Sequence, residues 1–122
     1  MANKVLVVDD SKTARREISR IIHNHGILTL EAENGKAALG VLHEKQGISL
    51  VFCDVNMPEM NGIEFLEAVK KEEKFKALPI VMLTSEATRD VMDRAKELGV
   101  TGWIIKPAES ATVKALLDSF CA

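Results

Sequence analysis

The sequence predicts an α/β fold in which a doubly wound, five-stranded parallel sheet is covered on both faces by five helices. Short apolar segments alternate five times with amphipathic segments along the 122 residues. Three of the apolar segments are nearly continuous, as in strands that are buried on both faces. Parallel strands need crossover connections, which helices supply. A chain of this length has no room for an eight-stranded α/β barrel.

The predicted strands differ in pattern. Residues 4–9 form an almost unbroken apolar run that ends in two aspartates, which predicts a buried strand. Residues 27–33 alternate leucine and alanine with threonine and glutamate, which predicts a strand partly open to water at an edge of the sheet. Residues 49–54 and 79–84 predict two further buried strands, and residues 102–106 predict a short fifth strand.

Apolar stripes at helical spacing separate these strands. Ala14, Ile18, Ile21 and Ile22 fall at i, i+4, i+7 and i+8, which predicts a helix that ends at Gly26. Four more helices are predicted from similar stripes and caps, at residues 34–42, 63–74, 88–98 and 110–120. Because no linker or low-complexity segment interrupts this pattern, we expect residues 1–122 to form a single domain.

Composition excludes several classes of protein. The hydrophobic share of 47% and the charged share of 28% match an ordinary folded domain. Lys and Arg number 16 against 18 Asp and Glu, so the chain lacks the basic field of a nucleic-acid-binding protein. No apolar run approaches the ~20 residues that span a bilayer, and the N-terminus does not resemble a signal peptide. We expect a cytoplasmic monomer without membrane insertion or direct nucleic-acid contact.

Polar residues follow the predicted strands at their carboxyl ends. Asp9 and Asp10 follow the first strand, Asp54 ends the third, Thr84 ends the fourth, and Lys106 ends the fifth. In open parallel sheets, ligands bind outside these ends. Three carboxylates, a hydroxyl and an ammonium group should therefore meet at one edge of the sheet. Each residue alone also fits a solvated surface position, so their joint placement carries the prediction.

Three crowded carboxylates repel one another, so a cation is expected among them. Lys106 supplies only one positive charge. Magnesium fits the remaining need, because Mg²⁺ binds one or two carboxylates and keeps waters that phosphoryl oxygens can replace. A carboxylate in this setting can attack a phosphoryl group, and Asp54 is the predicted nucleophile.

Four segments carry these residues and resemble a known family: VVDD at 7–10, DVNMPEMNG at 54–62, LTS at 83–85 and KP at 106–107. With them, the whole chain resembles the receiver domain of two-component response regulators, most closely the stand-alone, CheY-like chemotaxis members. The resemblance implies the flavodoxin-like strand order 2-1-3-4-5. It also implies a cis peptide bond between Lys106 and Pro107.

The resemblance implies roles in metal binding and phosphorylation. Asp54 is the implied phosphoacceptor and a magnesium ligand. Asp10 is an implied direct ligand, Asp9 a ligand through water, and Asn56 a ligand through its backbone carbonyl. The side chains of Asn56 and Glu86 match positions that tune self-dephosphorylation. Glu86 equally fits a solvated acid at the start of a helix.

The resemblance also implies a switch. Thr84 is the implied switch hydroxyl, and Lys106 binds the phosphoryl group. Trp103 stands where the family usually has Tyr or Phe, so it is either a switch aromatic or a plain packed side chain. Ala108 follows Lys106-Pro107 where Phe is frequent, which removes an aromatic from the face that partners usually bind.

The implied function is a signalling switch and not a turnover enzyme. A histidine kinase donates a phosphoryl group to Asp54, and the changed surface binds a flagellar motor switch protein or another phosphotransfer protein. Alternatives within the family are a phosphorelay intermediate or the receiver of a larger transcriptional regulator. From another class, a magnesium-dependent phosphatase of the haloacid dehalogenase type also uses an aspartate nucleophile. In that class the Asp-x-Asp motif follows the first strand, whereas here the predicted nucleophile, Asp54, ends the third strand. A flavin-binding carrier would need a Ser/Thr-Gly-rich loop after the first strand to bind the flavin phosphate, and the sequence has no such loop at that place.

Overall fold

A computed structural model describes residues 3–57, 59–85 and 88–121 of the chain. The strands are β1 (Lys4–Val8), β2 (Leu28–Ala32), β3 (Ile48–Asp54), β4 (Ile80–Thr84) and β5 (Gly102–Ile105). The α-helices are α1 (Lys12–Asn24), α2 (Gly35–Glu44), α3 (Gly62–Lys70), α4 (Arg89–Glu97) and α5 (Ser110–Phe120), and a 3-10 turn, η1, spans Glu73–Phe75. None of the described helices is long and apolar enough to cross a membrane.

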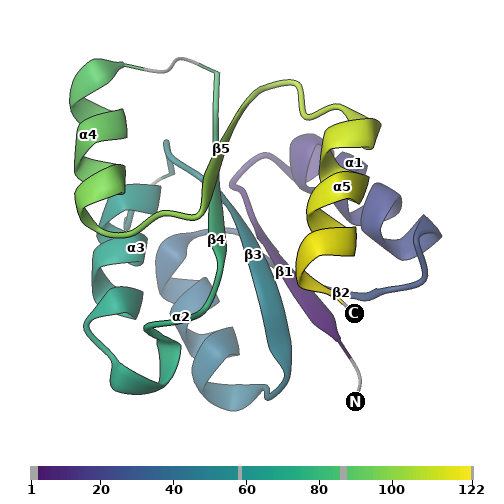
Figure 1. The fold of residues 1–122 in the computed structure, drawn as a ribbon, viewed down its shortest axis with the longest axis horizontal. Coiled ribbons are helices and arrows are strands. Elements are labelled where there is room, and N and C mark those ends of the chain that lie inside the picture. Colours follow the sequence, from purple (N-terminus) through teal and green to yellow (C-terminus); the bar gives the residue numbers. More distant parts are fainter. Residues whose placement is uncertain (1–2, 58, 86–87, 122) are drawn as a thin grey trace.

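All five strands form one sheet in the order β2-β1-β3-β4-β5, with every neighbouring pair parallel. This confirms the predicted fold class and the strand order that the resemblance implied. Helices α1 and α5 cover one face of the sheet, and α2, α3 and α4 cover the other (Figure 1). The segment predicted to be an edge strand, β2, lies at an edge.

The core consists of two apolar layers, one on each face of the sheet. Along β1, Val5 and Val7 belong to the layer beneath α1 and α5, whereas Leu6 and Val8 belong to the layer beneath α2 to α4. All four side chains are fully buried. A slip of one residue would move each set of side chains into the opposite layer, so the packing of the two layers fixes the register and therefore where each strand ends.

The third helix is shorter than predicted. The apolar stripe predicts a helix over residues 63–74, but α3 ends at Lys70 and η1 follows. The Lys70 ammonium donates hydrogen bonds to the carbonyl oxygens of Lys76 (3.1 Å) and Leu78 (2.8 Å). The chain turns here because Phe75 and Leu78 pack against the layer beneath α2 to α4, a contact that helical spacing alone does not reveal.

Candidate functional site

The polar residues at the strand ends meet at the carboxyl edge of the sheet, as the sequence predicted. Val8 pairs with Cys53 across β1 and β3, so the aspartates that follow, Asp9 and Asp54, lie side by side at the ends of neighbouring strands. Both side chains are buried, with Asp54 only 5% exposed, whereas Asp10 is exposed. The apolar strands thus carry carboxylates to a place that water barely reaches.

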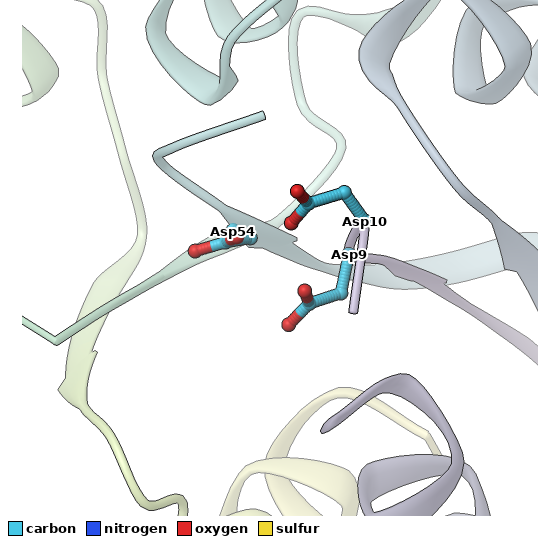
Figure 2. A group of neighbouring side chains, drawn as sticks. All are labelled: Asp9, Asp10 and Asp54. Carbon is cyan, nitrogen blue, oxygen red and sulfur yellow. The ribbon is translucent and has the colours of Figure 1, made fainter. Parts of the chain in front are cut away.

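The three carboxylates form a compact group. Asp9, Asp10 and Asp54 each offer an oxygen, and these oxygens lie within 4.8 Å of one another (Figure 2). Carboxylate oxygens are hard ligands of the kind that Mg²⁺ and Ca²⁺ take. The donor set therefore fits a hard divalent cation such as magnesium.

Lys106 bridges two of these carboxylates. Its Nζ lies 2.9 Å from Asp9 Oδ2 and 3.3 Å from Asp54 Oδ1. The Lys106 backbone N–H donates a 2.7 Å hydrogen bond to the carbonyl of Thr84, which ties it to the end of β4. The Lys106-Pro107 bond is cis, as the resemblance implied.

The electrostatics of the group is unfavourable. Burial, followed by the charge of Asp9, raises the pKa of Asp54 to about 6, although Lys106 opposes the shift. Burial would lower the pKa of Lys106, but its hydrogen bond to Asp9 and the nearby negative charges outweigh burial and raise it. The site therefore holds Lys106 charged and ionises Asp54 at a cost in free energy.

The remaining predicted residues lie around this group or outside the described residues. Thr84 is buried at the end of β4, and Asn56 is exposed two residues after Asp54. Glu86, and Pro58 of the segment at 54–62, lie outside the described residues.

Trp103 is half-buried against the layer beneath α2 to α4. Its neighbour Ile104 belongs to the opposite layer, as alternation along a strand requires. The indole Nε1 of Trp103 is buried and has no hydrogen-bond partner among the described residues. Ala108 packs against the layer beneath α1 and α5.

Two supporting residues are not evident from the sequence. Arg15 donates from its guanidinium to the backbone carbonyl of Asp9 (2.7 Å), which braces the end of β1. Gly62 begins α3 so close to the backbone of Asp54 that a Cβ would collide with that carbonyl oxygen. A polar helix residue near a strand end is the only sequence signal for Arg15, and the pattern around Gly62 indicates no more than a turn.

Comparison with known proteins gives a consistent result. The response regulator receiver domain family matches residues 5–118. Chemotaxis protein CheY-3 of Vibrio cholerae is 40% identical over 94% of this chain and 88% of its own length. Chemotaxis protein CheY of Pseudomonas aeruginosa is also 40% identical, over 94% and 93%.

Solved structures agree. The crystal structure of Vibrio cholerae chemotaxis protein CheY4 superposes with a TM-score of 0.90 at 34% identity, covering 98% of this chain and 99% of that one. The family match spans nearly the whole chain, and the relatives match over most of their own length. The chain therefore belongs to the response regulator receiver domain family, as a CheY-like signalling protein.

Proposed function

We propose that the chain is a phosphorylation-activated switch in which Asp54 accepts a phosphoryl group from a histidine kinase. The observation that carries the proposal is the setting of the Asp54 carboxylate, which is nearly buried, grouped with two other carboxylates and 3.3 Å from the Lys106 ammonium. On this proposal, residues 1–122 act as one receiver domain, working as a monomer in the cytoplasm.

The proposed metal is magnesium, held by the carboxylates of Asp10 and Asp54, by the backbone carbonyl of Asn56, and by Asp9 through water. The contacts of Asp9 support its indirect role. Its Oδ1 accepts a hydrogen bond from the Ser11 N–H (2.9 Å), and its Oδ2 accepts one from Lys106. When bound, Mg²⁺ would neutralise the carboxylates and the phosphoryl oxygens.

The chain's own residues then perform the transfer. A carboxylate oxygen of Asp54 forms the new bond to phosphorus while the phosphorus–nitrogen bond of the phosphohistidine breaks and the imidazole nitrogen takes up a proton. Lys106 stabilises the negative charge on the transferred group. The Thr84 hydroxyl donates a hydrogen bond to a phosphoryl oxygen, and Asn56 and Glu86 tune the later hydrolysis.

The proposed output is a changed surface around Thr84 and Trp103. CheY-like receivers in general interact with histidine kinases and motor switch proteins, and the relatives above are chemotaxis proteins. The proposed partner is therefore a flagellar motor switch protein, with another phosphotransfer protein as the second candidate. Capture from native lysate on beryllofluoride-loaded and unloaded protein separates the two.

Acetyl phosphate tests the reaction without a kinase. Intact-mass spectrometry should show one added phosphoryl group when magnesium is present and none in chelator. Asp54→Asn should abolish the addition, whereas Asp93→Asn, an exposed aspartate on α4, should leave it unchanged. Equal modification of Asp54→Asn, or full modification in chelator, would overturn the proposal. Steady turnover of a small phosphate ester would instead favour a phosphatase.

A further inference from the structure

A second cavity lies between α1 and the edge strand β2, and it shares no lining residue with the carboxylate site. Its volume is about 380 Å³. The walls come from α1 through Arg16, Ser19, Arg20 and His23, and from β2 through residues 28, 29 and 31. Cavities of roughly 300 Å³ and above are large enough for small organic ligands, and this one exceeds what a single inorganic ion needs.

Ser19 is the first sign that this groove binds something. Its side chain is only 8% exposed, and its Oγ has no hydrogen-bond partner within the described part of the chain. Buried hydroxyl groups are nearly always hydrogen-bonded, and a serine inside a helix can satisfy its hydroxyl by bonding to the carbonyl four residues earlier. The hydroxyl of Ser19 makes no such bond. Its donor is therefore unused in the wall of the groove, and a change of rotamer would present it to a ligand there.

The charge of the groove is the second sign. Arg16 and Arg20 lie one turn apart on α1, both are exposed, and neither forms an ion pair or hydrogen bond with any residue that the structure describes. Arg15, by contrast, is fully engaged with the Asp9 carbonyl and with Glu31. Glu31 also lines the groove, but its carboxylate is 2.8 Å from the Arg15 guanidinium, which compensates its charge. The groove therefore carries an excess of positive charge.

We infer that this groove binds the phosphate group of a small organic phosphate. A guanidinium offers two parallel N–H donors that match two phosphate oxygens, and Arg16 and Arg20 present two such groups on one side of the groove. Ser19 donates its hydroxyl to a further oxygen. Leu28 is 54% exposed and offers an apolar contact for the organic part of the ligand. This site is separate from phosphorylation of Asp54 and does not depend on it.

Phenylphosphonate is a suitable probe, because its phosphorus–carbon bond prevents transfer of a phosphoryl group to Asp54. We expect its titration into the full chain in chelator, followed by amide NMR shifts, to give saturable changes confined to residues 16–23 and 28–31. Inorganic phosphate should bind more weakly, because it lacks the organic group. The absence of saturable shifts up to millimolar probe, or shifts confined to the surroundings of Asp54 and Lys106, would overturn the inference. Equal binding of inorganic phosphate would overturn the assignment to an organic ligand.

Single substitutions test the named contacts. Arg20→Gln and Ser19→Ala should each weaken phenylphosphonate binding about tenfold, the effect of losing one charge-assisted hydrogen bond. Arg89→Gln is the matched control, because it makes the same charge change at an exposed position on α4. Ser19→Ala should melt no lower than the wild type, since it removes an unsatisfied hydroxyl, so weaker binding would not reflect loss of fold. Wild-type affinity in either groove variant would overturn the site.

Discussion

The polar groups at the two ends of the parallel sheet are paired in opposite ways. At the amino end, single polar groups close local hydrogen bonds near the surface. The Lys4 ammonium donates to the carbonyl of Gln46 (2.7 Å), and the Thr101 hydroxyl accepts from the Ile80 N–H (3.1 Å). Each of these groups has a hydrogen-bond partner. The polar groups at this end of the sheet therefore have little effect on the stability of the fold.

At the carboxyl end, the same strands deliver like charges to one buried place. Asp9 and Asp54 share a single ammonium, that of Lys106, and Asp10 adds a third carboxylate. Burial and the neighbouring charge of Asp9 raise the pKa of Asp54 to about 6, so ionising Asp54 costs free energy. The carboxyl end therefore lowers the stability of the fold and carries the candidate site, whereas the amino end does neither. Matched substitutions at both ends test that difference.

The largest expected effect is loss of the shared cation. Lys106→Met leaves buried Asp9 and Asp54 without compensation, and breaking a buried pair in this way costs roughly 3 to 4 kcal/mol. Lys4→Met, the same substitution at the amino end, should cost less than about 1 kcal/mol, because it removes one hydrogen bond near the surface. Urea unfolding at pH 7 in chelator measures both free energies of unfolding. Equal losses at the two ends would contradict the comparison.

Removal of the Asp54 charge should have the opposite effect and raise the free energy of unfolding. The pKa of Asp54 is about 6 in the folded chain and 3.8 for an ordinary aspartate, so the folded state binds the proton more tightly. The stability contributed by this group therefore falls as the pH rises from about 4 to about 6. Asp54→Asn should raise the free energy of unfolding in chelator at pH 7 by roughly 2 to 3 kcal/mol, because each tenfold difference in proton affinity between the folded and unfolded chain corresponds to about 1.4 kcal/mol.

The pH dependence supplies the control for this variant. Below about pH 4, Asp54 is protonated in both the folded and the unfolded chain, so the advantage of Asp54→Asn should disappear there. Asp93→Asn, at an exposed position, should show no comparable gain at either pH. A gain of Asp54→Asn that persists unchanged at pH 4 would assign it to packing and not to charge.

Magnesium should raise the free energy of unfolding by binding at the carboxyl end of the sheet alone. A ligand that binds only the folded state at one hundred times its Kd stabilises that state by about 2.7 kcal/mol. We expect a rise of this order for the wild type on adding magnesium, and a much smaller rise for Asp10→Ala, because a carboxylate ligand is lost. Calorimetric melting with and without chelator measures both. A full magnesium response in Asp10→Ala would remove Asp10 from the proposed ligand set.

Most of this contrast could be predicted from the sequence, because it follows from the sheet. Apolar runs predict β1, β3 and β4, and the ends of parallel strands necessarily share one edge, so Asp9, Asp54 and Thr84 are expected to meet. No knowledge of side-chain conformation is needed for that step. The fold class and the convergence of the polar residues are therefore properties of the pattern.

Other features depend on contacts that the pattern does not encode. The bond from Arg15 to the Asp9 carbonyl requires one rotamer of a long side chain. The unpartnered hydroxyl of Ser19 and the guanidinium groups beside it become visible only when α1 is packed against β2. The early end of α3 depends on Phe75 reaching the core. Each feature joins segments that periodicity treats separately.

The smallest expected effect is spectroscopic and concerns how the carboxyl end communicates with the rest of the sheet. Trp103 pairs with Met82 on β4, two residues before Thr84, so a movement of the β4 end can reach it through the strand pair. On the proposed function, phosphorylated Asp54 draws the Thr84 hydroxyl inward by a charge-assisted hydrogen bond and vacates space beside the half-buried indole.

Trp103 should then turn partly inward, because burial of apolar surface is worth about 25 cal/mol per Å². An indole is larger than the phenol of a tyrosine, so it should not fit completely into the vacated space. We therefore expect a shift in population between two positions of the side chain and not a complete flip. As Trp103 is the only tryptophan, fluorescence reports it directly. Emission should move to shorter wavelength on beryllofluoride loading in magnesium, and the move should vanish in Thr84→Ala. An unchanged spectrum in the loaded wild type would identify Trp103 as a packed aromatic that takes no part in the switch, and would confine the response to the carboxyl end itself.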